Sequence, residues 1–135
     1  MVTLSLLIDE YRRNWAIRYL REAESDLCTA ERTPIEAISV SFAIMAMRKA
    51  QTSAYYSIGD PSYLSQMVNE AIEERGSPHG ASMRLLTDME LFIRFCAERG
   101  GALDKANAIV KAKALLSVVS RLISLMTNER SVGMA

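Results

Sequence analysis

Few side chains in this chain could carry catalysis, and its single histidine, His79, limits the chemistry further. A di-iron helical bundle needs Glu-x-x-His pairs on facing helices, which one histidine cannot supply. Zinc sites of the usual kinds need more cysteine and histidine ligands than the chain can bring together. His79 lies between Gly76 and Gly80 in a predicted loop, where a solvated or capping role is more common than a catalytic one. We therefore expect no metal, no cofactor and no enzymatic activity.

The two cysteines, Cys28 and Cys96, lie far apart in the sequence and form no C-x-x-C motif. Each falls in a segment with helical apolar periodicity, so we expect reduced thiols that are buried as small hydrophobic side chains. Either thiol could pair with His79 as nucleophile and base, but no local motif supports such a pair.

Arginine and aromatic residues alternate near the N-terminus. The arginines are Arg12, Arg13 and Arg18, and the aromatic residues among them are Tyr11, Trp15 and Tyr19. An RNA-binding protein could use the arginines for phosphates and the rings for base stacking, with His79 as a further contact. Alternatively, aromatic residues at helical spacing belong to the core, and the arginines pair with carboxylates on a solvated face. We favour the second interpretation because acidic residues are interleaved with these arginines.

Four methionines, Met45, Met47, Met67 and Met89, could line a pocket for a small ligand. Methionine more often fills irregular gaps in a hydrophobic core. We therefore favour a core role for these residues and keep the pocket as an alternative.

The elements that would position these side chains are helices, and the segment from Thr33 to Gly59 is the most informative of them. Thr33 and Pro34 are typical of an N-cap and a first helical position, and Gly59 is typical of a helix end. The run 37–47 carries no charge and is apolar on every side. Such a helix must be covered all round, so we predict a central helix near residues 34–58.

Four further helices are predicted around the central one from apolar residues at three- and four-residue spacing. Asp60-Pro61 predicts the start of a short helix, and Gly100-Gly101 predicts the end of a longer one. Within that longer helix, Arg84 with Asp88 and Glu90 with Arg94 form (i, i+4) pairs on the solvated side. The predicted ranges are 4–31, 61–75, 81–99 and 102–128, followed by a flexible tail over 129–135.

These elements predict the fold class. We expect a single all-α domain over residues 1–135, an antiparallel up-down bundle of about five helices, four long and one short. The 16 basic and 16 acidic residues balance, so the chain as a whole has no attraction to nucleic acid or anionic lipid.

The last predicted helix carries two apolar stripes. One of them has heptad-like spacing and can pack within its own bundle. The other is a row formed by Leu115, Val118, Leu122 and Leu125. A helix with two apolar stripes needs two partners, so the row should contact a further helix or another protein chain. We predict that the chain self-associates through this row as a homodimer, and that Leu122→Asp prevents it.

Two of these segments together resemble a known family. Tyr19 to Leu27 contains the sequence Ala-Glu-Ser-Asp-Leu, and Ala46 to Ala50 lies in a helix of small, apolar and basic residues. Over roughly residues 15–75 this pattern resembles the first two helices of the HEPN superfamily of small prokaryotic helical bundles.

The resemblance implies a dimer, and either RNA cleavage, as in toxins, or partnership with a nucleotidyltransferase. The ribonuclease motif of this superfamily is an arginine followed, after four to six residues, by a histidine near the start of the last long helix. Here the nearest approximation, Arg75 to His79, is one residue too short and lies in a predicted loop. The resemblance therefore implies a scaffold or binding role without the nuclease, with RNA binding or processing as the alternative.

No segment of the sequence indicates a membrane or a secretory pathway. The apolar N-terminal run is followed at once by Asp9 and Glu10, and no basic residue precedes it, so it does not match a secretory signal. The uncharged run 37–47 is shorter than the roughly 18 residues that indicate a transmembrane helix. We expect a cytoplasmic protein.

Overall fold

A computed structural model describes residues 2–74, 80–98 and 103–134 of the chain, with side chains over 9–126 of these ranges. The described residues form an all-α bundle joined by short connections. Its helices are α1 (Val2–Arg32), α2 (Glu36–Ile58), α3 (Pro61–Glu73), α4 (Gly80–Glu98) and α5 (Lys105–Met134). The prediction of an all-α bundle with four long helices and one short helix is confirmed.

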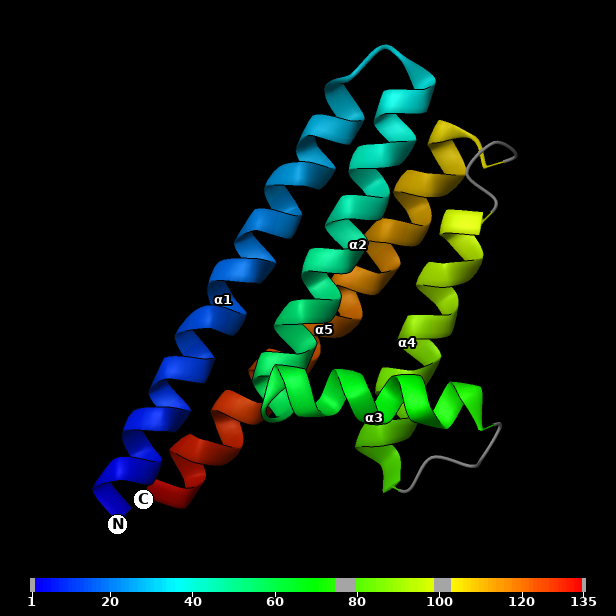
Figure 1. Cartoon of the computed structure of the whole chain (residues 1–135). Helices are drawn as coiled ribbons and strands as arrows, with labels where there is room; N and C mark the ends of the chain where they lie inside the picture. Colours follow the sequence, from blue (N-terminus) through cyan, green and yellow to red (C-terminus); the bar gives the residue numbers. More distant parts are fainter. Residues whose placement is uncertain (1, 75–79, 99–102, 135) are drawn as a thin grey trace.

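The helix α2 is the central element of the bundle, because each of the other four helices packs against it. Figure 1 shows α1, α2, α4 and α5 alternating in direction along the bundle, whereas α3 lies across the lower end of α2 and α4. The up-down arrangement therefore describes four helices, and α3 crosses them. Asp60 begins α3 as predicted, since its Oδ1 accepts hydrogen bonds from the backbone N–H groups of Ser62 and Tyr63 at 2.9 and 3.3 Å.

Two helix boundaries differ from the sequence prediction. Thr33 does not cap α2: its hydroxyl donates to the carbonyl oxygen of Thr29 at 2.6 Å and so belongs to the end of α1. The N-cap of α2 is Ile35, which offers no side-chain oxygen. At the other end of the chain, α5 continues through Met134, where we expected a flexible tail from residue 129. No proline interrupts this segment, so the backbone can remain helical.

A seam of small residues joins α1 to α2. Ala16, Ala23 and Ala30 recur every seven residues along α1 and are fully buried. From α2, Ser39 and Ser53 donate hydrogen bonds across the seam to the carbonyl oxygens of Ala30 and Ala16, at 2.6 and 2.5 Å. A serine hydroxyl is one bond from Cβ, so it reaches the backbone of another helix only where the two helices approach closely. The seam therefore has no room for large side chains.

The aromatic residues of α1 lie at the edge of this seam and not in the core. Tyr11 is exposed, and Trp15 and Tyr19 are half-buried. Trp15 and Tyr19 stack on Tyr56 of α2, with ring centroids 6.2 and 5.7 Å apart. The prediction that these residues belong to the core is wrong, because the close approach of α1 and α2 excludes rings from the line between them.

The central helix is not covered on all sides, contrary to the prediction from its uncharged run. Ile38 and Met45 of α2 are exposed, whereas Ala43, Ala46 and Met47 are fully buried. The helices α1, α5 and α4 lie around the rest of the circumference of α2. Three neighbouring helices leave part of the surface of a fourth open, which explains the exposed apolar strip.

Candidate functional site

An apolar groove lies between α4 and α5. The helix α4 packs on α2 and α3, and α5 packs on α1 and α2, so neither packs extensively on the other. The groove is the space left between them. Its lining consists of Leu85, Asp88, Met89 and Phe92 from α4 and Ala114, Leu115 and Val118 from α5.

The four residues of the row that the sequence predicted as an interface differ in their burial. Leu115 is buried and Leu122 packs against the core, whereas Val118 and Leu125 are 44% and 60% exposed. The row runs along the border between the face of α5 that contacts α2 and the face that turns to solvent. The residues available to a partner are therefore Val118 and Leu125. Leu122→Asp would place a charge beside the core and is not a clean test of association.

The helix α4 adds apolar surface that the sequence did not single out. Leu91 and Phe95 are exposed large hydrophobic residues on its outward side, and Phe92, which lines the groove, is half-buried. The core positions of α4 include Leu86 and Ile93, which are fully buried. In the sequence, the apolar residues of this helix cover more of its circumference than one buried stripe requires. Only the packing shows which of them face outward.

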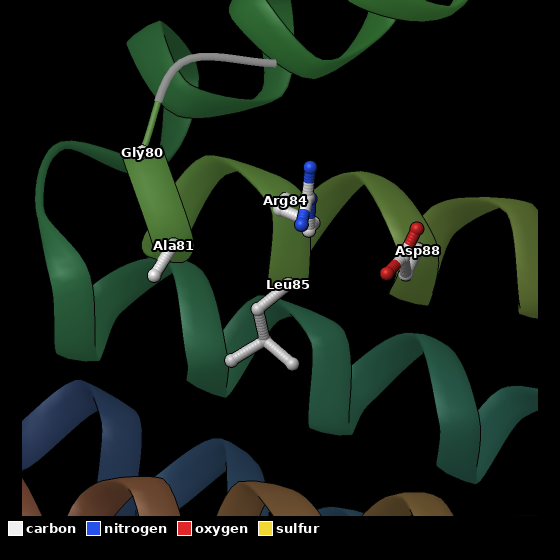
Figure 2. A pocket seen from close by; sticks show the side chains of 5 residues that line it. All are labelled: Gly80, Ala81, Arg84, Leu85 and Asp88. Atoms are coloured by element: carbon white, nitrogen blue, oxygen red, sulfur yellow. The ribbon is translucent and has the colours of Figure 1, made fainter. Parts of the chain in front are cut away.

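Two residues of the groove also line a hollow at the start of α4, whose lining Figure 2 shows. Leu85 and Asp88 line both, and Gly80, Ala81 and Arg84 complete the hollow. The predicted ion pair between Arg84 and Asp88 is not formed in the described structure. Both side chains are exposed, so two charges border the apolar face of α4 without compensating each other.

A cluster of polar side chains fixes α4 in this position. Glu90, only 8% exposed, accepts hydrogen bonds from Arg48 and Gln51 of α2 at 2.8 and 2.6 Å. Its other oxygen accepts from Arg94 at 2.8 Å, and Arg94 also donates to Asn69 of α3 at 3.0 Å. The expectation that Glu90 and Arg94 form a solvated pair is correct for the pairing and wrong for the burial of Glu90. The cluster ties α4 to both α2 and α3.

The electrostatics of this cluster indicate a structural role. Burial by itself would raise the pKa of Glu90, but hydrogen bonds from Gln51, Arg48 and Arg94 outweigh it and lower the pKa below its ordinary value. Burial, assisted by the negative charge of Glu90, raises the pKa of Tyr55 to about 12. Glu90 is thus ionised and Tyr55 neutral near pH 7, and neither is poised to exchange a proton.

The arginines predicted for RNA binding do not share a surface. Arg12 and Arg13 are consecutive, so they project about 100° apart on α1, and Arg18 points in a third direction. Arg12 is ion-paired with Asp9 at 2.6 Å, and the guanidinium carbon of Arg18 lies 5.0 Å from the ring centroid of Trp15. The fourth candidate of this set, His79, lies outside the described residues, as does Arg75.

The two cysteines are free thiols in different surroundings. Cys96 is buried, as expected, and burial raises its pKa although the nearby charge of Lys111 partly lowers it. The Cys96 thiol is therefore protonated and a poor nucleophile. Cys28 is exposed, so the expectation of burial is wrong for it; the neighbouring Leu27 takes the position that faces the core.

The four methionines considered as a ligand pocket are spread over different surroundings. Met47 and Met89 are buried, Met67 is half-buried and Met45 is exposed. Of these, Met89 lines the groove. The set as a whole therefore does not form one pocket.

Two further tests concern metals and membranes. Over residues 2–74, 80–98 and 103–134, no group of three or more histidine, cysteine or carboxylate side chains is arranged to hold a metal ion. Within the same ranges, no helix combines the length and the apolar content that a bilayer crossing requires.

Comparison with protein families, with curated proteins and with solved structures finds no match to this chain.

Proposed function

We propose that this protein is a non-catalytic helical interaction module of the cytoplasm that self-associates through the face formed by α4 and α5. The supporting observation is the apolar groove, whose lining includes the exposed Val118, together with three further exposed large hydrophobic residues on the same two helices, Leu91, Phe95 and Leu125. Apolar surface left in water often marks a site of protein–protein interaction. A second copy is the simplest partner, because a two-fold axis brings the same patch of both subunits together.

The lining of the groove favours binding over catalysis. Asp88 is its one titratable side chain, and no cysteine, serine, lysine or histidine accompanies it there. A catalytic site needs a nucleophile or a general base with an orienting partner, and a small-ligand site needs several convergent polar groups. An apolar lining with one carboxylate fits the side chains of another helix. The resemblance to the HEPN superfamily, whose members pair as dimers, is in keeping with the same proposal.

Val118→Asp should abolish self-association, because it places a charge in the groove while the residue is 44% exposed in the subunit. We expect sedimentation velocity at tens of micromolar to show a dimer for the wild type and a monomer for the variant, with unchanged helicity by circular dichroism. Ile38→Asp is the matched control, since Ile38 is 43% exposed on the open strip of α2. A wild-type monomer overturns the proposal, and loss of the dimer only in Ile38→Asp moves the interface to α2.

RNA binding is the alternative function, and we expect labelled single-stranded RNA to show no mobility shift with this protein even at low salt. Arg12 and Arg18 are engaged within α1, and the predicted arginines diverge, so they cannot follow one phosphate backbone. A salt-sensitive shift that disappears in the double variant Arg12→Ala, Arg13→Ala would contradict this expectation and favour the alternative.

A further inference from the structure

Two exposed charges on α4 lie at equal distances from its exposed apolar centre. Arg84 precedes Leu91 by seven residues, and Glu98 follows Leu91 by seven residues. All three side chains are exposed, and neither charge forms an ion pair within the described parts of the chain. Seven residues are almost two helical turns, so the three residues lie on one side of the helix. That side therefore carries a positive end, an apolar centre and a negative end.

This pattern is complementary to itself when two copies of α4 run antiparallel. A two-fold axis at Leu91 places Arg84 of each copy level with Glu98 of the other, because both lie about 10.5 Å from the axis at 1.5 Å per residue. Both possible ion pairs are then formed at once. The parallel arrangement would instead set like charges side by side, which disfavours it.

The exposed ring of Phe95 lies beside this axis. Phe95 follows Leu91 by four residues, so it lies level with Thr87 of the other copy, which precedes Leu91 by four. At 100° per residue, Phe95 lies about 40° from Leu91 around the helix. The ring therefore belongs to the same face as Leu91 and adds apolar surface to the pairing. Aromatic residues are enriched among the anchors of protein interfaces.

We infer that a second copy of this chain docks antiparallel on α4, with Leu91 at the two-fold axis, Phe95 beside it and Arg84 opposite Glu98 of the other copy. This inference rests on the proposed self-association and specifies its geometry. The partner of the exposed α4 face is thus the same face of an identical chain. Charge complementarity selects it over an unrelated partner, since each charged end of α4 finds its opposite on the second copy.

Charge reversal tests this geometry. In Arg84→Glu, residues 84 and 98 are both acidic, and in Glu98→Arg both are basic, so each variant alone should dimerise about tenfold more weakly than the wild type. An equimolar mixture should regain wild-type affinity, because both ion pairs re-form between the two variants. The double variant should regain it as well. A positive charge suits the C-terminal end of a helix, so Glu98→Arg leaves the fold of the subunit intact.

The outcomes separate this geometry from the proposed function. Recovery in the mixture, measured by sedimentation and by native mass spectrometry of the heterodimer, supports the antiparallel pairing. A wild-type dimer that is lost in Val118→Asp but is unaffected by either charge reversal overturns the pairing and leaves the proposed function standing. Weakening without recovery in the mixture also overturns it. Arg13→Glu, an exposed reversal on α1, is the matched control and should keep wild-type affinity.

Discussion

Replacing Glu90 with alanine should lower the free energy of unfolding by about 3 kcal/mol. The substitution removes the acceptor of three hydrogen bonds and leaves Arg48, Gln51 and Arg94 without their partner between α2 and α4. Removing one member of a buried ion pair costs about 3–5 kcal/mol. We expect the lower end, because the side chains of Arg48 and Arg94 are 43% and 40% exposed and can regain water. Urea unfolding followed by circular dichroism measures this change.

The pH dependence of stability distinguishes the charge of Glu90 from its packing. The pKa of Glu90 in the folded state lies below its ordinary value of 4.5. Its contribution to stability is therefore complete above that ordinary value and is lost as the pH falls through the folded-state pKa. Glu90→Gln should consequently lose less stability than the wild type on acidification. If the free energy of unfolding falls equally in the two proteins at acidic pH, the charge of Glu90 does not stabilise the fold.

A matched control is available on the surface of α1. Glu24 is exposed and forms no ion pair within the described chain, so Glu24→Ala should change the free energy of unfolding by less than about 0.5 kcal/mol. The Glu90 cluster also holds α4 beside the groove. A Glu90→Ala protein that still folds should therefore associate more weakly than the wild type.

Replacing Ala23 with leucine should destabilise the protein by about 3 kcal/mol, the upper part of the usual range for overpacking. Ala23 is fully buried at the middle of the seam between α1 and α2. A leucine there forces the helices apart and lengthens the hydrogen bonds from Ser39 and Ser53 to the backbone of α1. Thermal and urea unfolding give the loss of stability.

The single tryptophan reports on the same change, because Trp15 stacks on Tyr56 across the edge of the seam. An opened seam should shift the fluorescence emission of Trp15 in the folded protein. The matched control is Ala106→Leu on α5, where the alanine is exposed and the same substitution should be nearly neutral. Equal effects of the two substitutions would contradict a tightly packed seam.

The sequence alone determined the number, type and order of the helices. The cap at Asp60, the proline after it and the glycine before it are local signals, and they act through the backbone of the residues beside them. Apolar periodicity is local in the same sense, because it needs only the 3.6-residue period of the helix. For these reasons the bundle and the short third helix could be predicted without knowledge of any contact between helices.

Only the tertiary structure decided which side of each helix meets water. Trp15 lies half-buried at the edge of the seam because alanines and serines on two helices bring α1 and α2 close together. Glu90 was buried because two arginines and a glutamine on two helices converge on it. Val118 lines a groove because α4 packs on α2 and α3 and leaves α5 uncovered. Each of these outcomes depends on distances between residues remote in sequence, which no local pattern contains.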